Sequence, residues 1–288
     1  MPSASTMVLG VIGCPVEHSL SPAMHMAAIA ALGLDATYLA FHVEPAGLRD
    51  AIAGMRALGI RGLNATIPHK DALVPLMDEL DHSALAAGCV NTVTNEQGRL
   101  VGSSTDGPGF LRSLAEEGVC LDGGRVVVAG SGGSARAIAF ALGRSVASLH
   151  LAARNEAARE SLAEALAQRG IAVSTGNLLP SGLGAALRDA SALVNTTPLG
   201  MWPETTGCIP VDPESLRQGL IVVDIVYTPQ PTRLLRIARE AGCRTLGGVG
   251  MLVHQGAIAF ERWTGRAAPV TAMRAALKEE LRARSAAD

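Results

Sequence analysis

The sequence predicts an α/β protein of two domains. Short apolar runs alternate with amphipathic segments of helix length along most of the chain, a pattern typical of parallel sheets with helical crossovers. The 288 residues exceed one ordinary domain, and 48% of them are hydrophobic, so the chain can bury two cores. The pattern changes near Asp106 and again near Gly247, where we expect the domain joints.

Apolar runs and their boundary residues define the elements of the first part. Ser21 followed by Pro22 is typical of a helix start, and Gly33 is typical of a residue just past a helix end. We expect strands over 7–12, 37–43 and 62–67, helices over 22–32, 46–60 and around 71–88, and a hairpin over 90–106 with its turn near 95–98.

The second part alternates more regularly. An amphipathic helix is expected over 107–118, and a strand, a glycine-rich turn and a helix over 125–143. The remaining expectations are strands within 148–155, 191–201, 220–229 and 243–248, and helices over 156–170, 231–242, 250–263 and 269–284.

Composition excludes several classes of protein. The net charge is −2, aromatic residues make up 3%, and no long basic run occurs, so we do not expect nucleic acid as a partner. The five cysteines are scattered without a CxxC pair, which favours reduced thiols and predicts no metal site. No signal peptide and no transmembrane helix is evident, so we expect a cytoplasmic protein without a membrane partner.

A glycine-rich loop follows the strand near Val128. It fits the G-x-G-x-x-G/A pattern of a Rossmann-type dinucleotide-binding domain, because it lies between a valine-rich strand and an alanine-rich helix. Its backbone N–H groups would approach a pyrophosphate at the helix N-terminus. The alternative is a turn that binds no ligand. The residues expected to bind the cofactor here are Gly130, Ser131, Gly132, Gly133, Ser134 and Ala135.

Arg154 follows the next strand and favours NADP over NAD. NAD-binding members of this fold carry an acidic residue at about this place, which holds the ribose hydroxyls. A guanidinium pairs instead with a 2′-phosphate through charge-assisted hydrogen bonds. The alternative is a solvated surface arginine in an arginine-rich chain. We therefore expect NADP as the cofactor, with NAD binding at lower affinity.

Eight segments together resemble the shikimate dehydrogenase family over nearly the whole chain. They are HSLSP (18–22), NATIPHK (64–70), VNT (90–92), STDGPGF (104–110), GSGGSAR (130–136), NTTPLGM (195–201), DIVY (224–227) and GVGMLVHQ (248–255). The resemblance implies an N-terminal α/β substrate domain with a mixed, mainly parallel sheet, formed by 1–106 and completed by 248–288. A Rossmann-type NADP-binding domain over 107–247 would be inserted between them.

The resemblance also implies a reaction and a role for each matching residue. The family interconverts shikimate and 3-dehydroshikimate with a nicotinamide cofactor, in the pathway to aromatic amino acids. Lys70 and Asp106 would be the catalytic pair. Substrate would be bound by Ser19 and Ser21 at its carboxylate, by Asn64, Thr66, Asn91 and Gln255 at its hydroxyls, and by Tyr227 nearby. Asn155, Thr197, Ile225, Gly248 and Met251 would complete the cofactor site.

The choice of lysine at position 70 fits this chemistry. Only two of the 24 basic residues are lysines, and the other, Lys278, lies in a charged C-terminal segment. Alcohol oxidation requires a group that takes a proton, and a desolvated lysine can lose its own proton near neutral pH whereas arginine cannot. The alternative is a structural ion pair with Asp71 or Asp106.

Three positions depart from the family pattern, and several alternative functions stay open. Ser104 stands where Asn is usual, Ala65 where Val is usual, and Ala153 where Asn precedes Arg in many NADP-dependent members. The alternative functions are a quinate/shikimate or amino-shikimate dehydrogenase, another Rossmann enzyme such as a folate dehydrogenase, and a non-catalytic NADP-sensing protein. We expect a monomer or a homodimer.

Overall fold

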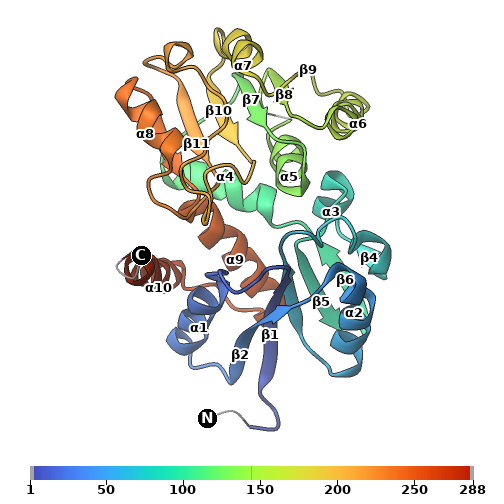
Figure 1. Cartoon of the computed structure of the whole chain (residues 1–288). Coiled ribbons are helices and arrows are strands. Elements are labelled where there is room, and N and C mark those ends of the chain that lie inside the picture. Colours follow the sequence, from blue (N-terminus) through green and yellow to red (C-terminus); the bar gives the residue numbers. More distant parts are fainter. Residues whose placement is uncertain (1–2, 144, 286–288) are drawn as a thin grey trace. The chain divides into compact units, whose positions relative to one another are not determined.

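The computed structural model describes residues 3–143 and 145–285, which form two compact units (Figure 1). The first unit comprises Met1–Gly109 and Val253–Asp288, and the second comprises Phe110–Leu252. The two boundaries fall inside helices α4 (Asp106–Glu116) and α9 (Val249–Thr264). The first unit is therefore built from two separate stretches of chain, with the second unit inserted between them.

The first unit contains a mixed sheet, as the sequence predicts. Its strand order is β2-β1-β3-β5-β6-β4. Strand β1 is parallel to β2 and β3, and β4 is parallel to β6, whereas β5 is antiparallel to both of its neighbours. The strands are β1 (Met7–Gly13), β2 (Ala36–His42), β3 (Gly62–Ala65), β4 (Glu79–Leu80), β5 (Thr92–Glu96) and β6 (Arg99–Ser103).

Side chains alternate between the two faces of this sheet, and helices cover both faces. Ile12 packs into the core beneath α2 (Leu48–Ala57), together with Leu63. Tyr38 lies on the other face, where its ring stacks on His25 of α1 (Ser21–Ala31) at 4.2 Å between ring centroids. Figure 1 shows α2 on one side of the sheet and α1, beside α10 (Val270–Ser285), on the other.

The C-terminal stretch completes the first unit. The Trp263 indole lies where a Cβ at position 62 would be, so only glycine allows this contact. Trp263 Nε1 donates to the carbonyl oxygen of Val93 at 3.1 Å, and Arg61 Nε donates to the carbonyl oxygen of Trp263 at 3.1 Å. Arg284 of α10 donates to the carbonyl oxygen of His18 at 2.9 Å. Residues more than 150 positions apart therefore share one core.

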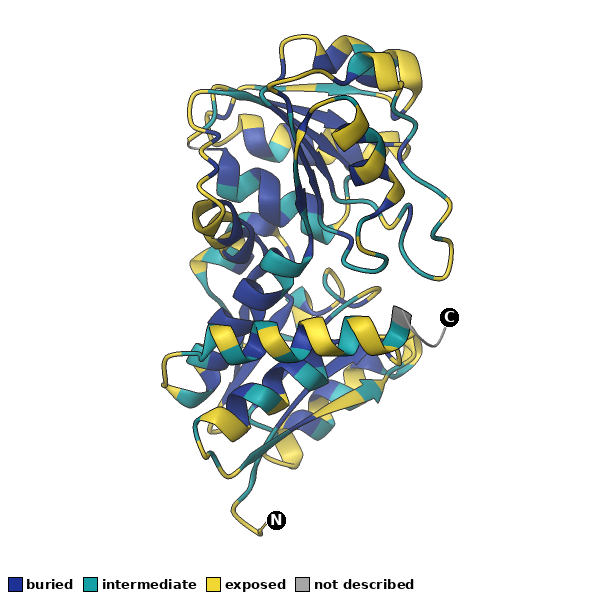
Figure 2. Cartoon of the chain, turned by 90° about the vertical axis from the view of Figure 1, so that its left-hand side faces the viewer, coloured by how far each residue is buried: buried dark blue, intermediate teal, exposed yellow. Residues whose placement is uncertain are grey.

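The second unit contains a fully parallel sheet, ordered β12-β11-β10-β7-β8-β9. Val126 and Val128 pack beneath α4, α5 and α6, while Val127 and Ala129 pack beneath α7 and α8. The central strands β7, β8, β10 and β11 are accordingly buried on both faces, as their near-continuous apolar sequences predict (Figure 2). The elements are β7 (Arg125–Ala129), α5 (Gly133–Leu142), β8 (Ser148–Ala152), α6 (Glu156–Ala167), β9 (Val173–Gly176), α7 (Pro180–Leu187), β10 (Ala192–Asn195), β11 (Ile221–Asp224), α8 (Arg233–Glu240) and β12 (Arg244–Gly247).

The structure differs from the sequence expectation mainly at 71–88. Instead of helices throughout, this segment contains a 3-10 turn, η2 (Val74–Leu76), the two-residue strand β4, and the short helix α3 (His82–Ala87). Pro75 is compatible only with the start of a helix, and Asp81 begins a new one by accepting a hydrogen bond from Ala84 N. Strand β9 was also not predicted, and the other 3-10 turns are η1 (Pro45–Gly47) and η3 (Pro213–Ser215).

Helix lengths and apolarity bear on membrane insertion. Across residues 3–143 and 145–285, none of the helices is both long enough and apolar enough to cross a bilayer.

A buried carboxyl group orders two loops at one edge of the second sheet. Asp224, fully buried at the end of β11, accepts hydrogen bonds from Asn195 Nδ2 at 2.9 Å, Val226 N at 3.1 Å and the Thr232 hydroxyl at 2.7 Å. Burial raises the pKa of Asp224 to about 6, even though these three donors favour its charged form. The loops that follow β10 and β11 are thereby joined through one carboxyl group.

This pKa predicts a pH-dependent contribution to stability. Because the folded state binds the Asp224 proton more tightly than the unfolded state, the contribution is greatest below pH 4 and is lost as the pH rises to about 6. In an Asp224→Asn variant the amide oxygen can accept from Asn195 and Val226, and the amide nitrogen can donate to the Thr232 hydroxyl. This variant should gain stability relative to the original chain as the pH rises from 4 to above 6, by up to about 3 kcal/mol. Urea unfolding between pH 4 and 7.5 measures the difference.

The control for this experiment is Asp189→Asn, which changes an exposed aspartate in the same unit. It should leave the stability difference from the original chain independent of pH. A difference between Asp224→Asn and the original chain that stays constant from pH 4 to 7.5 would contradict the assignment.

Candidate active site

Strand direction brings polar residues of the first unit together at one end of the strands of its sheet. The parallel strands β1 and β3 end at this edge. Strand β5 runs the other way, so it begins here, with Thr92 opposite Asn64. Strand β6 returns to the same edge, where Ser103 pairs with Thr92, and the chain continues directly into α4 at Asp106. The mixed sheet thus places Asn64, Asn91 and Asp106 near one another.

Lys70 and Asp106 form the ion pair at the centre of this edge. Lys70 Nζ lies 2.6 Å from Asp106 Oδ2, and the two side chains are only 16% and 6% exposed. The backbone around Lys70 is fixed from two directions, because its carbonyl oxygen accepts from Val90 N at 2.9 Å and the adjacent His69 contacts the carbonyl oxygen of Val43 through Nε2 at 2.8 Å. The ammonium group is therefore held beside the carboxylate.

Asn91 positions the other oxygen of this carboxylate. Its Nδ2 donates to Asp106 Oδ1 at 2.7 Å, and its own Oδ1 accepts from Thr105 N at 2.7 Å. Asn91 Nδ2 also lies 3.4 Å from Gln255 Oε1. Gln255 belongs to α9, which packs so closely on α4 that a Cβ on Gly109 would be 2.6 Å from Gln255 N. The structure thus brings together Asn91, Asp106, Gln255 and Lys70, and the roles expected for them stay predictions.

Hydrogen bonds extend from Asn91 towards the start of α1. Thr92 donates its hydroxyl to Asn91 Oδ1 at 3.1 Å and accepts from Asn64 Nδ2 at 3.0 Å. Asn64 Oδ1 accepts from the Tyr38 hydroxyl at 2.8 Å, and Tyr38 also hydrogen-bonds Ser21. Burial raises the pKa of Tyr38 far above its ordinary value, so this side chain stays a neutral donor.

The remaining substrate residues lie in loops at the ends of strands. Ser21 is the first residue of α1 rather than its cap, which is Leu20, and its backbone N donates to Ser19 Oγ at 3.3 Å. Thr66 follows β3, with its methyl group against Gly13. Tyr227 belongs to the second unit, in the loop after β11. The roles expected for these residues stay predictions.

Ser104, one of the departures from the family pattern, lies beside a buried thiol. Its hydroxyl is 3.9 Å from Cys89 Sγ, and its backbone N donates to Ser83 Oγ at 2.9 Å. Burial raises the pKa of Cys89 to about 11, so the thiol is protonated at neutral pH. Ser104 is itself buried, and it adjoins the Thr105–Asp106 segment of the ion pair.

The glycine-rich loop of the second unit has the conformation that its sequence predicts. Gly130 has φ +123°, and a Cβ there would collide with Thr196 Oγ1, so both backbone conformation and space require glycine. Gly132 is the N-cap of α5, and Ala135 is completely buried against the sheet. The loop lies between β7 and β10, where the order of strands reverses, the position at which doubly wound sheets bind ligands.

Among the residues that follow β8, Arg154 is exposed, whereas Asn155 and Arg159 make hydrogen bonds to the backbone. Arg154 is exposed, two residues beyond the end of β8. Arg159, by contrast, is buried and donates to the carbonyl oxygens of Ala153 and Gly176. Asn155 caps α6 by accepting a hydrogen bond from Ala158 N at 3.1 Å. Arg154 is therefore open to solvent beyond the end of β8, and its role in binding a cofactor stays a prediction.

Other cofactor residues follow the neighbouring strands at the same edge. Thr197 follows β10 and is fixed by Asn195, whose Oδ1 accepts from its hydroxyl at 2.7 Å. Ile225 follows β11, and Gly248 lies so close to its carbonyl oxygen that no Cβ would fit. Met251 packs in the same core as Ile225. Each expected cofactor residue thus lies at, or just beyond, the carboxyl end of a parallel strand.

Several residues of these networks are assigned no role from the sequence, although Thr92, Thr105, Asn195 and Asp224 lie within the segments that resemble the family. Each is an ordinary polar residue, and pairing between distant segments reveals its contacts. They are Tyr38, Thr92 and Thr105 in the first unit, and Asn195, Asp224 and Thr232 in the second.

Comparison with known proteins identifies the family. The substrate binding domain of shikimate dehydrogenase matches residues 11–93, and the C-terminal domain of shikimate 5′-dehydrogenase matches residues 248–278. The shikimate dehydrogenase (NADP(+)) of Moorella thermoacetica is 47% identical over 284 residues, which cover 98% of this chain and 96% of that protein.

Solved structures agree with this result over nearly the full length. A shikimate dehydrogenase in complex with NADP+ has a TM-score of 0.91 and 39% identity, covering 98% of each chain. A quinate dehydrogenase from Corynebacterium glutamicum in complex with NAD has a TM-score of 0.86 and 34% identity, covering 95% of this chain and 99% of that one. The expected two-domain α/β fold is confirmed, and the chain belongs to the shikimate dehydrogenase family.

Proposed function

We propose that this protein is an NADP-dependent shikimate dehydrogenase that reversibly reduces 3-dehydroshikimate to shikimate. The largely buried ion pair between Lys70 and Asp106, 2.6 Å apart, is the observation that carries the proposal. A protein that only senses NADP needs no such pair. The names of the relatives support the same substrate and cofactor, since the Moorella protein is a shikimate dehydrogenase (NADP(+)).

The side chains of the first unit fit the proton transfer of this reaction. The nicotinamide supplies the hydride when NADPH is bound. Lys70 would donate its proton to the substrate oxygen during reduction and take it back during oxidation. Asp106 accepts a hydrogen bond from Lys70 at one oxygen and from Asn91 at the other. It thereby fixes the direction of the ammonium group and would orient the reacting hydroxyl.

The substrate would be held by the polar residues around this pair. Ser19 and Ser21 would donate to the carboxylate from the start of α1. Asn64, Thr66, Asn91 and Gln255 would bind the ring hydroxyls, with Tyr227 nearby. The proposal is supported by the hydrogen bonds that join Asn64 to Thr92 and Asn91 to Gln255 within the first unit. Two serines leave limited room for the extra hydroxyl of quinate, which favours shikimate.

The cofactor site would use the carboxyl edge of the second sheet. Gly130, Ser131, Gly132, Gly133, Ser134 and Ala135 form the turn into α5, whose N-terminus favours a pyrophosphate. Arg154 would pair with the 2′-phosphate and Asn155 and Thr197 would line the cofactor. Ile225, Gly248 and Met251 would adjoin the nicotinamide.

The decisive experiment measures initial rates with shikimate and quinate, each with NADP and with NAD. We expect the highest kcat/KM with shikimate and NADP. A preference for quinate or for NAD would identify a paralogous activity, like that of the quinate dehydrogenase that binds NAD. A complete lack of NADP reduction across a panel of cyclic hydroxy acids would support a sensing protein instead.

Replacing Lys70 by methionine tests the catalytic role. Methionine keeps the length of the side chain but cannot carry a proton, so kcat should fall by roughly 10²–10⁴-fold or more. NADP affinity, measured by fluorescence titration, should be largely unchanged. Lys278→Met is the matched control, because Lys278 is the other lysine and is exposed on α10, and it should retain full activity. Near-native turnover by Lys70→Met would refute the role.

Replacing Arg154 by alanine tests the cofactor preference. Loss of a charge-assisted contact with the 2′-phosphate costs about 1.5–3 kcal/mol, so the KM for NADP should rise roughly 10- to 100-fold. The KM for NAD, which lacks this phosphate, should change little. Arg188→Ala removes another exposed arginine of the second unit and should alter neither KM. Equal effects of Arg154→Ala on both cofactors would contradict the assignment.

A further inference from the structure

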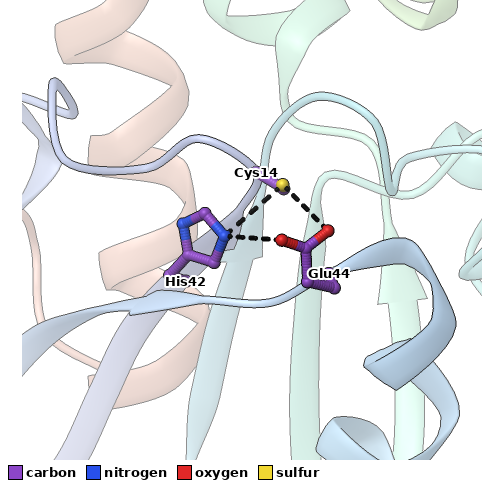
Figure 3. A group of neighbouring side chains, drawn as sticks. All are labelled: Cys14, His42 and Glu44. Atoms are coloured by element: carbon purple, nitrogen blue, oxygen red, sulfur yellow. Dashed lines mark hydrogen bonds and ion pairs between the residues drawn. The ribbon is translucent and has the colours of Figure 1, made fainter.

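Three potential metal ligands meet at the edge of the first sheet, away from the Lys70–Asp106 pair in sequence. Cys14 directly follows β1, His42 is the last residue of β2, and Glu44 comes two residues later. The two strands are parallel, with Gly13 paired to His42, so their ends bring these side chains together. Figure 3 shows the thiol, the imidazole and the carboxylate pointing towards one another.

The distances between the donor atoms are those of a tetrahedral zinc site. Cys14 Sγ lies 3.5 Å from His42 Nε2 and 3.6 Å from Glu44 Oε2, and His42 Nε2 lies 3.3 Å from Glu44 Oε1. With usual zinc bonds of about 2.0–2.3 Å, ligands at tetrahedral angles lie roughly 3.3–3.6 Å apart. Each pair of donor groups therefore has about this spacing, with one Glu44 oxygen near the thiol and the other near the imidazole, and single ligand atoms from the three residues lie within 4.8 Å of one another.

A fourth residue supports the histidine as a ligand. His42 Nδ1 lies 3.0 Å from Glu17 Oε1, so with a metal bound Nδ1 would carry the proton and donate it to that carboxylate, which would leave Nε2 to bind the ion. Ligating histidines typically have such a carboxylate partner. Glu17 and Glu44 also give the cluster the negative charge that attracts a cation.

We propose that Cys14, His42 and Glu44 bind a zinc ion, with water as the fourth ligand. A thiolate, an imidazole and a carboxylate are the donors that this borderline-soft ion prefers. Cys14 gives up its thiol proton to solvent as the metal binds. The side chains of His42 and Glu44 are 42% and 69% exposed, so both the ion and the water can reach the position from solvent.

Metal binding would also fix the loop between β1 and α1. Cys14 and Glu17 both belong to this loop, which ends near Ser19 and Ser21 at the start of α1. Their contact partners, His42 and Glu44, lie at the end of β2 and just after it. A bound ion would replace weak contacts between these segments by metal–ligand bonds. We therefore expect slower amide hydrogen exchange in peptides that cover residues 16–21 when zinc is present, a result that does not depend on the proposed enzymatic activity.

The test is zinc binding by the reduced full-length chain, measured by isothermal titration. One ion should bind per chain, and both Cys14→Ala and His42→Ala should abolish this binding. Glu17→Gln, which changes only the partner of His42, should weaken affinity roughly 10- to 100-fold. Cobalt added in place of zinc should show a thiolate-to-metal charge-transfer band that Cys14→Ala removes.

Matched controls use the same residue types elsewhere. Cys120→Ala and His82→Ala change an exposed cysteine and an exposed histidine outside the cluster, and both should keep full binding. Circular dichroism shows whether each variant is folded, and Glu44→Gln provides a further, isosteric test. Absence of stoichiometric binding by the original chain would overturn the proposal, and so would binding that folded Cys14 and His42 variants retain. Binding without slower exchange in residues 16–21 would overturn the inference about the loop.

Discussion

The arrangement of the first unit depends on the pairing of two largely buried charged groups. An ammonium and a carboxylate that leave water lose hydration, and only close pairing with further hydrogen bonds compensates for this loss. Asp106 meets both requirements, because one oxygen contacts Lys70 and the other accepts from Asn91. Asn91 is fixed in turn by Thr105 N. A small shift of β5 or of the start of α4 would leave a charge without its partner, so the pair constrains the packing around it.

Strand direction explains how the pair and its neighbours meet. In the second unit every strand is parallel, and all the loops that carry the expected cofactor residues leave at one edge. The first unit cannot rely on parallel strands alone, because Asn91 precedes a strand rather than following one. Because β5 is antiparallel to β3, the first residues of β5 lie beside the last residues of β3, with Thr92 opposite Asn64. The mixed sheet is thus a geometric requirement of this site.

Local patterns predict much of the structure, and contacts between distant segments account for the rest. The glycine-rich turn at Gly130, the alternation of strands and helices and the unusual lysine at position 70 are all visible in short windows of sequence. Strand β4, with two residues, is too short for any periodicity to show, and it lies where a helix was expected. The network around Asp224 and the meeting of Cys14 with His42 arise from pairing between separate strands, which no local window contains.

The discontinuous first unit has a consequence for synthesis. Its sheet packs against Trp263, whose indole occupies the space beside Gly62 and bonds to Val93. A ribosome releases the whole inserted unit, Phe110–Leu252, before that tryptophan emerges. The nascent chain therefore carries all six strands of the N-terminal sheet without α9, whose Trp263 packs on the same face as α1, until that helix has been translated. The unit translated first is the last to reach its native state.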